Sequence, residues 1–140
     1  MGAKISTSSW LAFVFSAMLL LAALISHAHA QQGHPLVGSW SGDWGATPNE
    51  RNRVLLLLDY DGAHITGVIN PGRASIALTS AALNPQDWSV RLEAAASEQT
   101  DGIGYLIEGR IENIGSITER TIVGTWMQGS QRGDFRIVMN

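Results

Sequence analysis

Four segments of the chain share a pattern in which a glycine lies midway between two large apolar residues. The pattern spans residues 36–40, 65–69, 107–111 and 122–126. In a β-strand, residues two apart lie on the same face, so each glycine is expected between two inward-pointing apolar side chains. An inward glycine lets a strand bend sharply, and bent strands let a small sheet curl and close. The pattern therefore predicts an all-β fold, an antiparallel up-and-down meander closed into a small barrel or a barrel-like sandwich.

Turn residues and period-2 alternation divide the chain after residue 30 into seven or eight short strands with local connections. Trp88, Val90 and Leu92 are expected to be buried on one face of the clearest strand. Arg91 and Glu93 are expected on its exposed face. Closure of such a meander would remove its unpaired edges.

The N-terminal segment has the features of an export signal. Lys4 precedes an apolar run from residue 10 to 25, and an Ala-His-Ala cleavage motif ends at Ala30. The run is shorter than the roughly 20 residues that a membrane-spanning helix prefers. We therefore predict that residues 1–30 form a signal helix that is cleaved as a signal peptide, with a retained membrane anchor as the alternative. Residues 31–140 are predicted to form a single β-barrel domain.

Composition excludes several classes of function. The chain has no cysteine, which excludes disulfides, thiol catalysis and cysteine-ligated zinc. After residue 30, eight arginines and no lysine face twelve acidic residues, which leaves a net charge of −4. Nucleic-acid binding requires a basic patch, so we predict no nucleic-acid partner. His34 and His64 lack partners at metal-ligand spacing, and we predict neither a metal nor a cofactor.

Two Gly-x-Trp segments carry a family resemblance. Gly38-Ser39-Trp40 opens the first predicted strand, and Gly124-Thr125-Trp126 occurs late in the meander. This arrangement resembles the calycins, which include lipocalins, fatty-acid-binding proteins and avidins. The resemblance implies that Trp40 plugs one end of a barrel beneath an arginine of the last strand, here Arg136. The lipocalin Thr-Asp-Tyr motif and the polar set that avidins place around biotin are absent, so no ligand identity is implied.

The segment from Trp40 to Gly45, with Pro48 and Asn49, also resembles a group of uncharacterised secreted bacterial proteins. That resemblance covers most of the chain after residue 30 and implies no activity. Together with the signal features, it implies a periplasmic or secreted bacterial protein. A retained anchor would instead hold the domain on the inner membrane, facing the periplasm.

Aromatic residues of the predicted interior are the candidate ligand-binding groups. Trp40 and Trp44 lie four residues apart, hence on one strand face, and Trp126 is expected to face the same interior. Such residues either line a pocket for an apolar ligand or a carbohydrate, or fill the core. Asp43 either accepts a hydrogen bond from a ligand at the barrel mouth or pairs with a local arginine. The predicted ligand-binding residues are Trp44, Trp40, Asp43, Trp126 and Tyr105.

Residues Val54–Leu58 break the alternation, because both faces of this predicted strand are apolar. Either a loop or the N-terminal arm covers the second face, or the strand is a surface for a protein partner.

No nucleophile motif and no paired acids stand out in the sequence, so we predict that the protein is not an enzyme. The leading hypothesis is an exported β-barrel module that binds a small apolar ligand or a protein partner. One alternative is a membrane-anchored accessory subunit of an envelope complex, docked through residues 54–58. Another is a small barrel hydrolase or isomerase that uses Asp43 and an arginine. Membrane contact is expected only if the N-terminal helix is retained.

Overall fold

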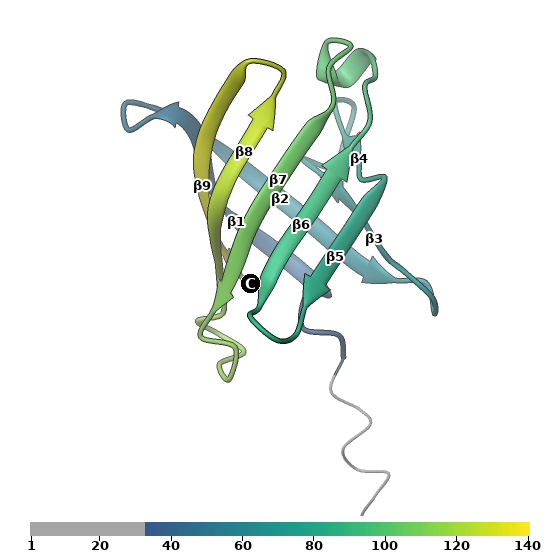
Figure 1. Ribbon diagram of the computed structural model, residues 1–140, viewed down its shortest axis with the longest axis vertical. Coiled ribbons are helices and arrows are strands. Elements are labelled where there is room, and N and C mark those ends of the chain that lie inside the picture. Colours follow the sequence, from purple (N-terminus) through teal and green to yellow (C-terminus); the bar gives the residue numbers. More distant parts are fainter. Residues whose placement is uncertain (1–32) are drawn as a thin grey trace, which may run out of the picture. The chain divides into compact units, whose positions relative to one another are not determined.

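The computed structural model describes residues 33–140, and these fold into nine antiparallel strands of one curled sheet (Figure 1). The strands are β1 (Gly38–Thr47), β2 (Glu50–Tyr60), β3 (Ile65–Ile69), β4 (Ile76–Ala77), β5 (Ser80–Asn84), β6 (Ser89–Ala94), β7 (Tyr105–Glu112), β8 (Thr121–Gln128) and β9 (Gln131–Met139). A single short 3-10 turn, η2 (Glu98–Thr100), precedes β7 in this part of the chain. The all-β prediction is confirmed, and the predicted signal helix of residues 1–30 lies outside the described residues.

The strand order is β4-β3-β2-β1-β9-β8-β7-β6-β5. Every hydrogen-bonded pair joins strands adjacent in sequence except β1 and β9, which bring the first and last strands together. The predicted antiparallel meander is therefore confirmed, whereas the predicted count of seven or eight strands is too low. The segment after β3 forms two short strands, because it changes partners midway. Leu78 donates its backbone N–H to Gly67 of β3, and Thr79 donates its N–H to Glu93 of β6.

This change of partner leaves β4 and β5 as the two edges of the sheet, with no ladder between them. The sheet thus forms a curled half-barrel (Figure 1). Two neighbouring residues of the β4–β5 connection nevertheless hydrogen-bond to strands on both sides of the opening.

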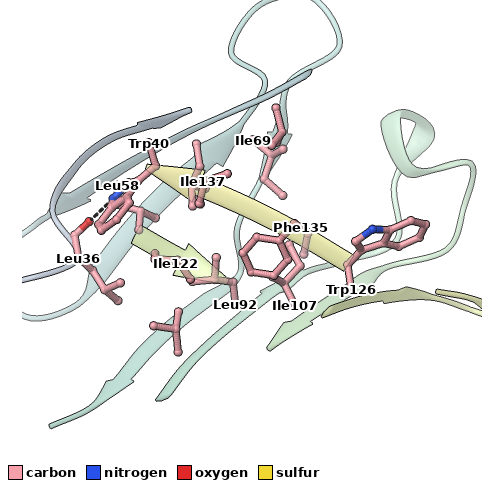
Figure 2. Packing of buried hydrophobic residues seen from close by; sticks show 14 of the residues in the cluster. Leu36, Trp40, Leu58, Ile69, Leu92, Ile107, Ile122, Trp126, Phe135 and Ile137 are labelled. Carbon is pink, nitrogen blue, oxygen red and sulfur yellow. Dashed lines mark hydrogen bonds between the residues drawn. The ribbon is translucent and has the colours of Figure 1, made fainter. Parts of the chain in front are cut away.

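Alternate residues of the strands turn inward and build one hydrophobic core, shown in Figure 2. Its buried members are Leu36, Trp40, Val54, Leu56, Leu58, Ile69, Ile76, Val90, Leu92, Ala94, Ile107, Ile111, Ile122, Trp126, Phe135 and Ile137. Val90 and Leu92 are buried and Arg91 is exposed, as predicted, whereas Glu93 is half-buried. Trp88 is half-buried rather than buried, because it precedes β6 and closes the turn with a φ of 59° and an N–H bond to Asn84.

Close backbone approach explains the glycines at the bends. Gly109 of β7 and Gly124 of β8 lie directly opposite each other. A Cβ on Gly124 would lie 2.0 Å from the backbone oxygen of Glu108, and one on Gly109 would lie 2.7 Å from a carbonyl oxygen of β8. Larger residues at these positions would force strands β7 and β8 apart. Gly38 differs, because its φ of 144° requires glycine while its Cβ would meet the Met139 side chain at 3.4 Å.

The apolar run in β2 divides between the two faces of the sheet. Val54, Leu56 and Leu58 belong to the core. On the outer face, Leu55 is half-buried and Leu57 is 36% exposed. The core thus accounts for three of the five residues, and the outer face retains one exposed leucine.

Candidate functional site

Three aromatic side chains meet at the end of the interior where β1 and β8 finish and β7 begins. The ring centroids of Trp44 and Tyr105 are 5.5 Å apart with an interplanar angle of 23°. Trp126 lies 5.8 Å from Trp44 and 6.2 Å from Tyr105, tilted against both. At these separations aromatic rings attract one another through offset and edge-to-face contacts. The structure therefore brings together three of the five predicted residues, which we call the aromatic cluster.

A pocket of about 520 Å³ lies beside the aromatic cluster and is called the open-end pocket. Its lining residues are Trp44, Gly45, Ala46, Asn49, Glu50, Arg51, Asn52, Tyr105, Trp126, Gln128 and Gln131. Six of these eleven residues carry a side-chain amide or a charge. The β1–β2 hairpin and the adjoining ends of β8 and β9 supply these polar groups.

Deeper in the sheet the interior is filled. The space among Trp44, Phe135 and the neighbouring core side chains is about 20 Å³. A space of this size holds no more than a water molecule. Within the interior, room for a ligand therefore lies at the open end, beside the aromatic cluster.

The register of the ladders explains why amides accompany the aromatic rings. Asn52 lies directly opposite Trp44 in the β1–β2 ladder. Gln128 of β8 lies opposite Tyr105 on one side and opposite Gln131 on the other. Directly opposed residues project their side chains to the same face of a sheet, so amide and ring stand side by side.

Gln128 also fixes the loop that precedes β7. Its Nε2 amide donates to the backbone oxygen of Thr100 at 2.7 Å and to that of Ile103 at 3.2 Å. The loop in turn affects Tyr105. Burial, and secondly the negative charge of Asp101, raise the pKa of the Tyr105 hydroxyl above its ordinary value of 10.0. Tyr105 thus carries a neutral hydroxyl at physiological pH.

The indole N–H of Trp126 is a buried donor without a hydrogen-bond partner among the described residues. Trp126 itself is 8% exposed and lines the open-end pocket. An unpaired buried donor costs free energy, which a hydrogen-bond acceptor would recover.

Asp43 lies outside the pocket lining and pairs with an arginine. Arg51 donates from Nε to Asp43 at 2.8 Å and from Nη1 to Asp134 at 2.5 Å. Both carboxylates raise the pKa of Arg51 and hold its guanidinium in place. The structure therefore places Asp43 on the exposed side of β1. Of the two roles considered for it, contact with a ligand or pairing with a local arginine, the structure shows the second.

Trp40 occupies the opposite end of the core, as Figure 2 shows. It is fully buried, and its indole N–H donates to the backbone oxygen of Leu36 at 2.8 Å. Arg136, which the calycin resemblance implies above Trp40, is exposed and pairs in register with Asp43. An inward position is closed to Arg136 because its neighbours in β9, Phe135 and Ile137, take the inner face.

The sequence did not predict the role of Arg120, which lies near Trp40 at the closed end of the core. It donates to the backbone oxygen of Pro35 at 3.0 Å and to that of Ile114 at 2.9 Å. These bonds tie the arm before β1 to the loop between β7 and β8. Arg120 lies just outside β8 in a stretch without periodicity, so the sequence offers no signal for this role.

Comparison of the chain with protein-family models, curated proteins and solved structures finds no match. Within residues 33–140, no helix is long and apolar enough to cross a membrane. The same residues hold no group of three acidic or histidine side chains arranged for a metal ion. The chemistry of the open-end pocket is therefore the basis for a functional proposal.

Proposed function

We propose that the protein is an exported, non-enzymatic binding module that takes a small ligand into the open-end pocket. One observation carries this proposal. Three aromatic side chains from β1, β7 and β8 converge beside a pocket of about 520 Å³, whereas the space beneath them is filled. Concave sites with aromatic walls and a few polar groups are typical of small-molecule binding.

The polar groups of the pocket favour binding over catalysis. Glu50 is the one carboxylate among the described lining residues, and Arg51 is already held by two carboxylates outside the lining. A general acid and base would require two such groups facing a common space. We further propose that the β4–β5 connection completes a barrel by its bonds to β3 and β6, which would protect both edges.

Titration with N-phenyl-1-naphthylamine, an uncharged apolar fluorophore, tests the proposal. We expect saturable binding by the wild type and at least tenfold weaker binding by Trp44→Ala, because the substitution removes a ring of the aromatic cluster. Ile117→Ser is the matched control, since Ile117 is 76% exposed in the loop between β7 and β8 and lies outside the pocket. Equal affinity of Trp44→Ala and the wild type would contradict the proposal.

Leu57 supports a second candidate, docking of a protein partner on the outer face of β2. Val68 of β3 lies directly opposite Leu57 and enlarges the apolar surface. Such a surface would suit the accessory subunit of an envelope complex. The test is to measure the size of the complex that contains this protein in extracts of the native envelope. If a Leu57→Asp substitution leaves that size unchanged, this role is excluded.

A further inference from the structure

We infer that the ligand of the open-end pocket is a small neutral carbohydrate of one or two sugar rings. The inference rests on the proposed function of that pocket and names the class of ligand. Three properties of the pocket carry it: the arrangement of the aromatic rings, the hydrogen-bonding groups around them and the balance of charge.

The three rings of the aromatic cluster pack against one another. Their centroids are 5.5 to 6.2 Å apart, so the rings touch and leave no space between two faces. A quaternary ammonium ligand is best held with several ring faces around it, which this contact prevents. A sugar ring needs one open aromatic face, because its C–H groups carry partial positive charge and pack on the negative face of the ring.

Side-chain amides lie around the aromatic cluster. Asn49, Asn52 and Gln131 line the pocket, and none of their side chains hydrogen-bonds to another residue in the range 33–140. Each amide offers donors and an acceptor, and each sugar hydroxyl is both a donor and an acceptor. A purely apolar ligand would leave the hydrogen-bonding groups of these exposed amides unused.

The charges at the mouth select against anions. The guanidinium of Arg51 is neutralised by Asp43 and Asp134. Glu50 in the lining and Asp101 near Tyr105 add negative charge. A phosphate, a fatty acid or a uronic acid would be repelled by this field, whereas a neutral sugar would not.

NMR of the ¹⁵N-labelled full chain tests the inference, because tryptophan indole N–H groups give separate signals. The probes are cellobiose, maltose and N,N′-diacetylchitobiose as neutral sugars, glucuronic acid as an anion, and N-phenyl-1-naphthylamine as an apolar ligand. We expect at least one neutral sugar to shift the Trp44 and Trp126 indole signals in a saturable manner. The Trp40 signal should stay in place, and glucuronic acid should shift none.

Variants of the amides distinguish the contribution of the amides to ligand affinity from that of the aromatic cluster. The double variant Asn52→Ala with Gln131→Ala is expected to weaken sugar binding at least tenfold and to change naphthylamine affinity less than twofold. Gln86→Ala is the matched control, since Gln86 is an exposed amide in the β5–β6 turn, at the other end of the strands (Figure 1). It should change neither affinity.

The outcomes are distinguishable. Binding of the naphthylamine without binding of any neutral sugar overturns the carbohydrate inference and leaves the proposed function standing. Binding of neither class overturns both. Sugar binding that the double variant leaves unchanged also overturns the inference, because the sugar then contacts another part of the molecule.

Discussion

Trp40 and Trp44 share one face of β1, and yet one is core and the other lines a pocket. Trp40 is fully buried and donates its indole N–H to Leu36, in the arm that precedes the strand. Trp44 is half-buried and packs against Tyr105 and Trp126 at the open end. The same side chain on the same face is structural where the chain folds back over it. It lines a pocket where the strands end without such a cover.

Alanine substitutions at Trp40 and Trp44 are expected to give the largest difference in the free energy of unfolding. Trp40→Ala is expected to lower the free energy of unfolding by roughly 3–5 kcal/mol, because a fully buried aromatic ring is lost from the core. Trp44→Ala should cost less than half as much, since its side chain already borders the pocket. Urea unfolding followed by circular dichroism measures both. Equal losses would show that the open end is as much a core as the closed end.

The arginines of the two ends offer a second contrast. Arg120→Ala should lower the free energy of unfolding by roughly 1.5–3 kcal/mol, because a partly buried guanidinium bonded to Pro35 and Ile114 is lost. Arg51→Ala should have a smaller effect that fades as salt is added, because its ion pairs with Asp43 and Asp134 are exposed. Unfolding in urea at low and high ionic strength distinguishes the two. A salt-sensitive loss in Arg120→Ala would contradict this assignment.

Gly42 lies between the two tryptophans and lets β9 approach β1. A Cβ at Gly42 would lie 2.0 Å from the backbone oxygen of Arg136. Gly42→Ala is therefore expected to cost about 1–3 kcal/mol through backbone displacement. Gly115→Ala is the control, because a Cβ there would meet nothing within 4 Å. Similar stability of both variants by urea unfolding would show that β9 lies farther from Gly42 than the structure indicates.

The sequence predicts the part of the fold that depends on local pattern. Alternation identifies the inward residues of most strands, and the apolar-x-Gly-x-apolar pattern predicts the curl of the sheet. Trp88 departs from the pattern, because a turn residue at positive φ does not follow the alternation of the strand after it. Arg136 departs because a family resemblance, rather than the pattern of β9, placed it over Trp40.

The candidate site was less predictable, because periodicity gives the face of a residue and not what covers that face. Five residues were predicted as ligand-binding, and the structure brings three of them together, Trp44, Tyr105 and Trp126, but not Trp40 or Asp43. The amides of Asn52 and Gln131 were not predicted. Their place in the pocket depends on how the β1–β2 and β8–β9 hairpins align with distant strands, which no local pattern encodes.

Ionisation of Tyr105 gives the smallest effect and probes the open end directly. Burial, and secondly Asp101, raise the pKa of its hydroxyl above 10.0 in the folded protein. A raised pKa means that the neutral hydroxyl contributes stability fully below pH 10, and that this contribution is lost as pH rises through the folded value. In a Tyr60→Phe background Tyr105 is the remaining tyrosine, so tyrosinate absorbance against pH reports it alone. We expect a midpoint above 10.0 that Asp101→Asn moves part of the way down, since burial is the larger cause. A midpoint at the ordinary value would place Tyr105 in open solvent, which would remove the third ring of the aromatic cluster and the contrast between the two ends of the core.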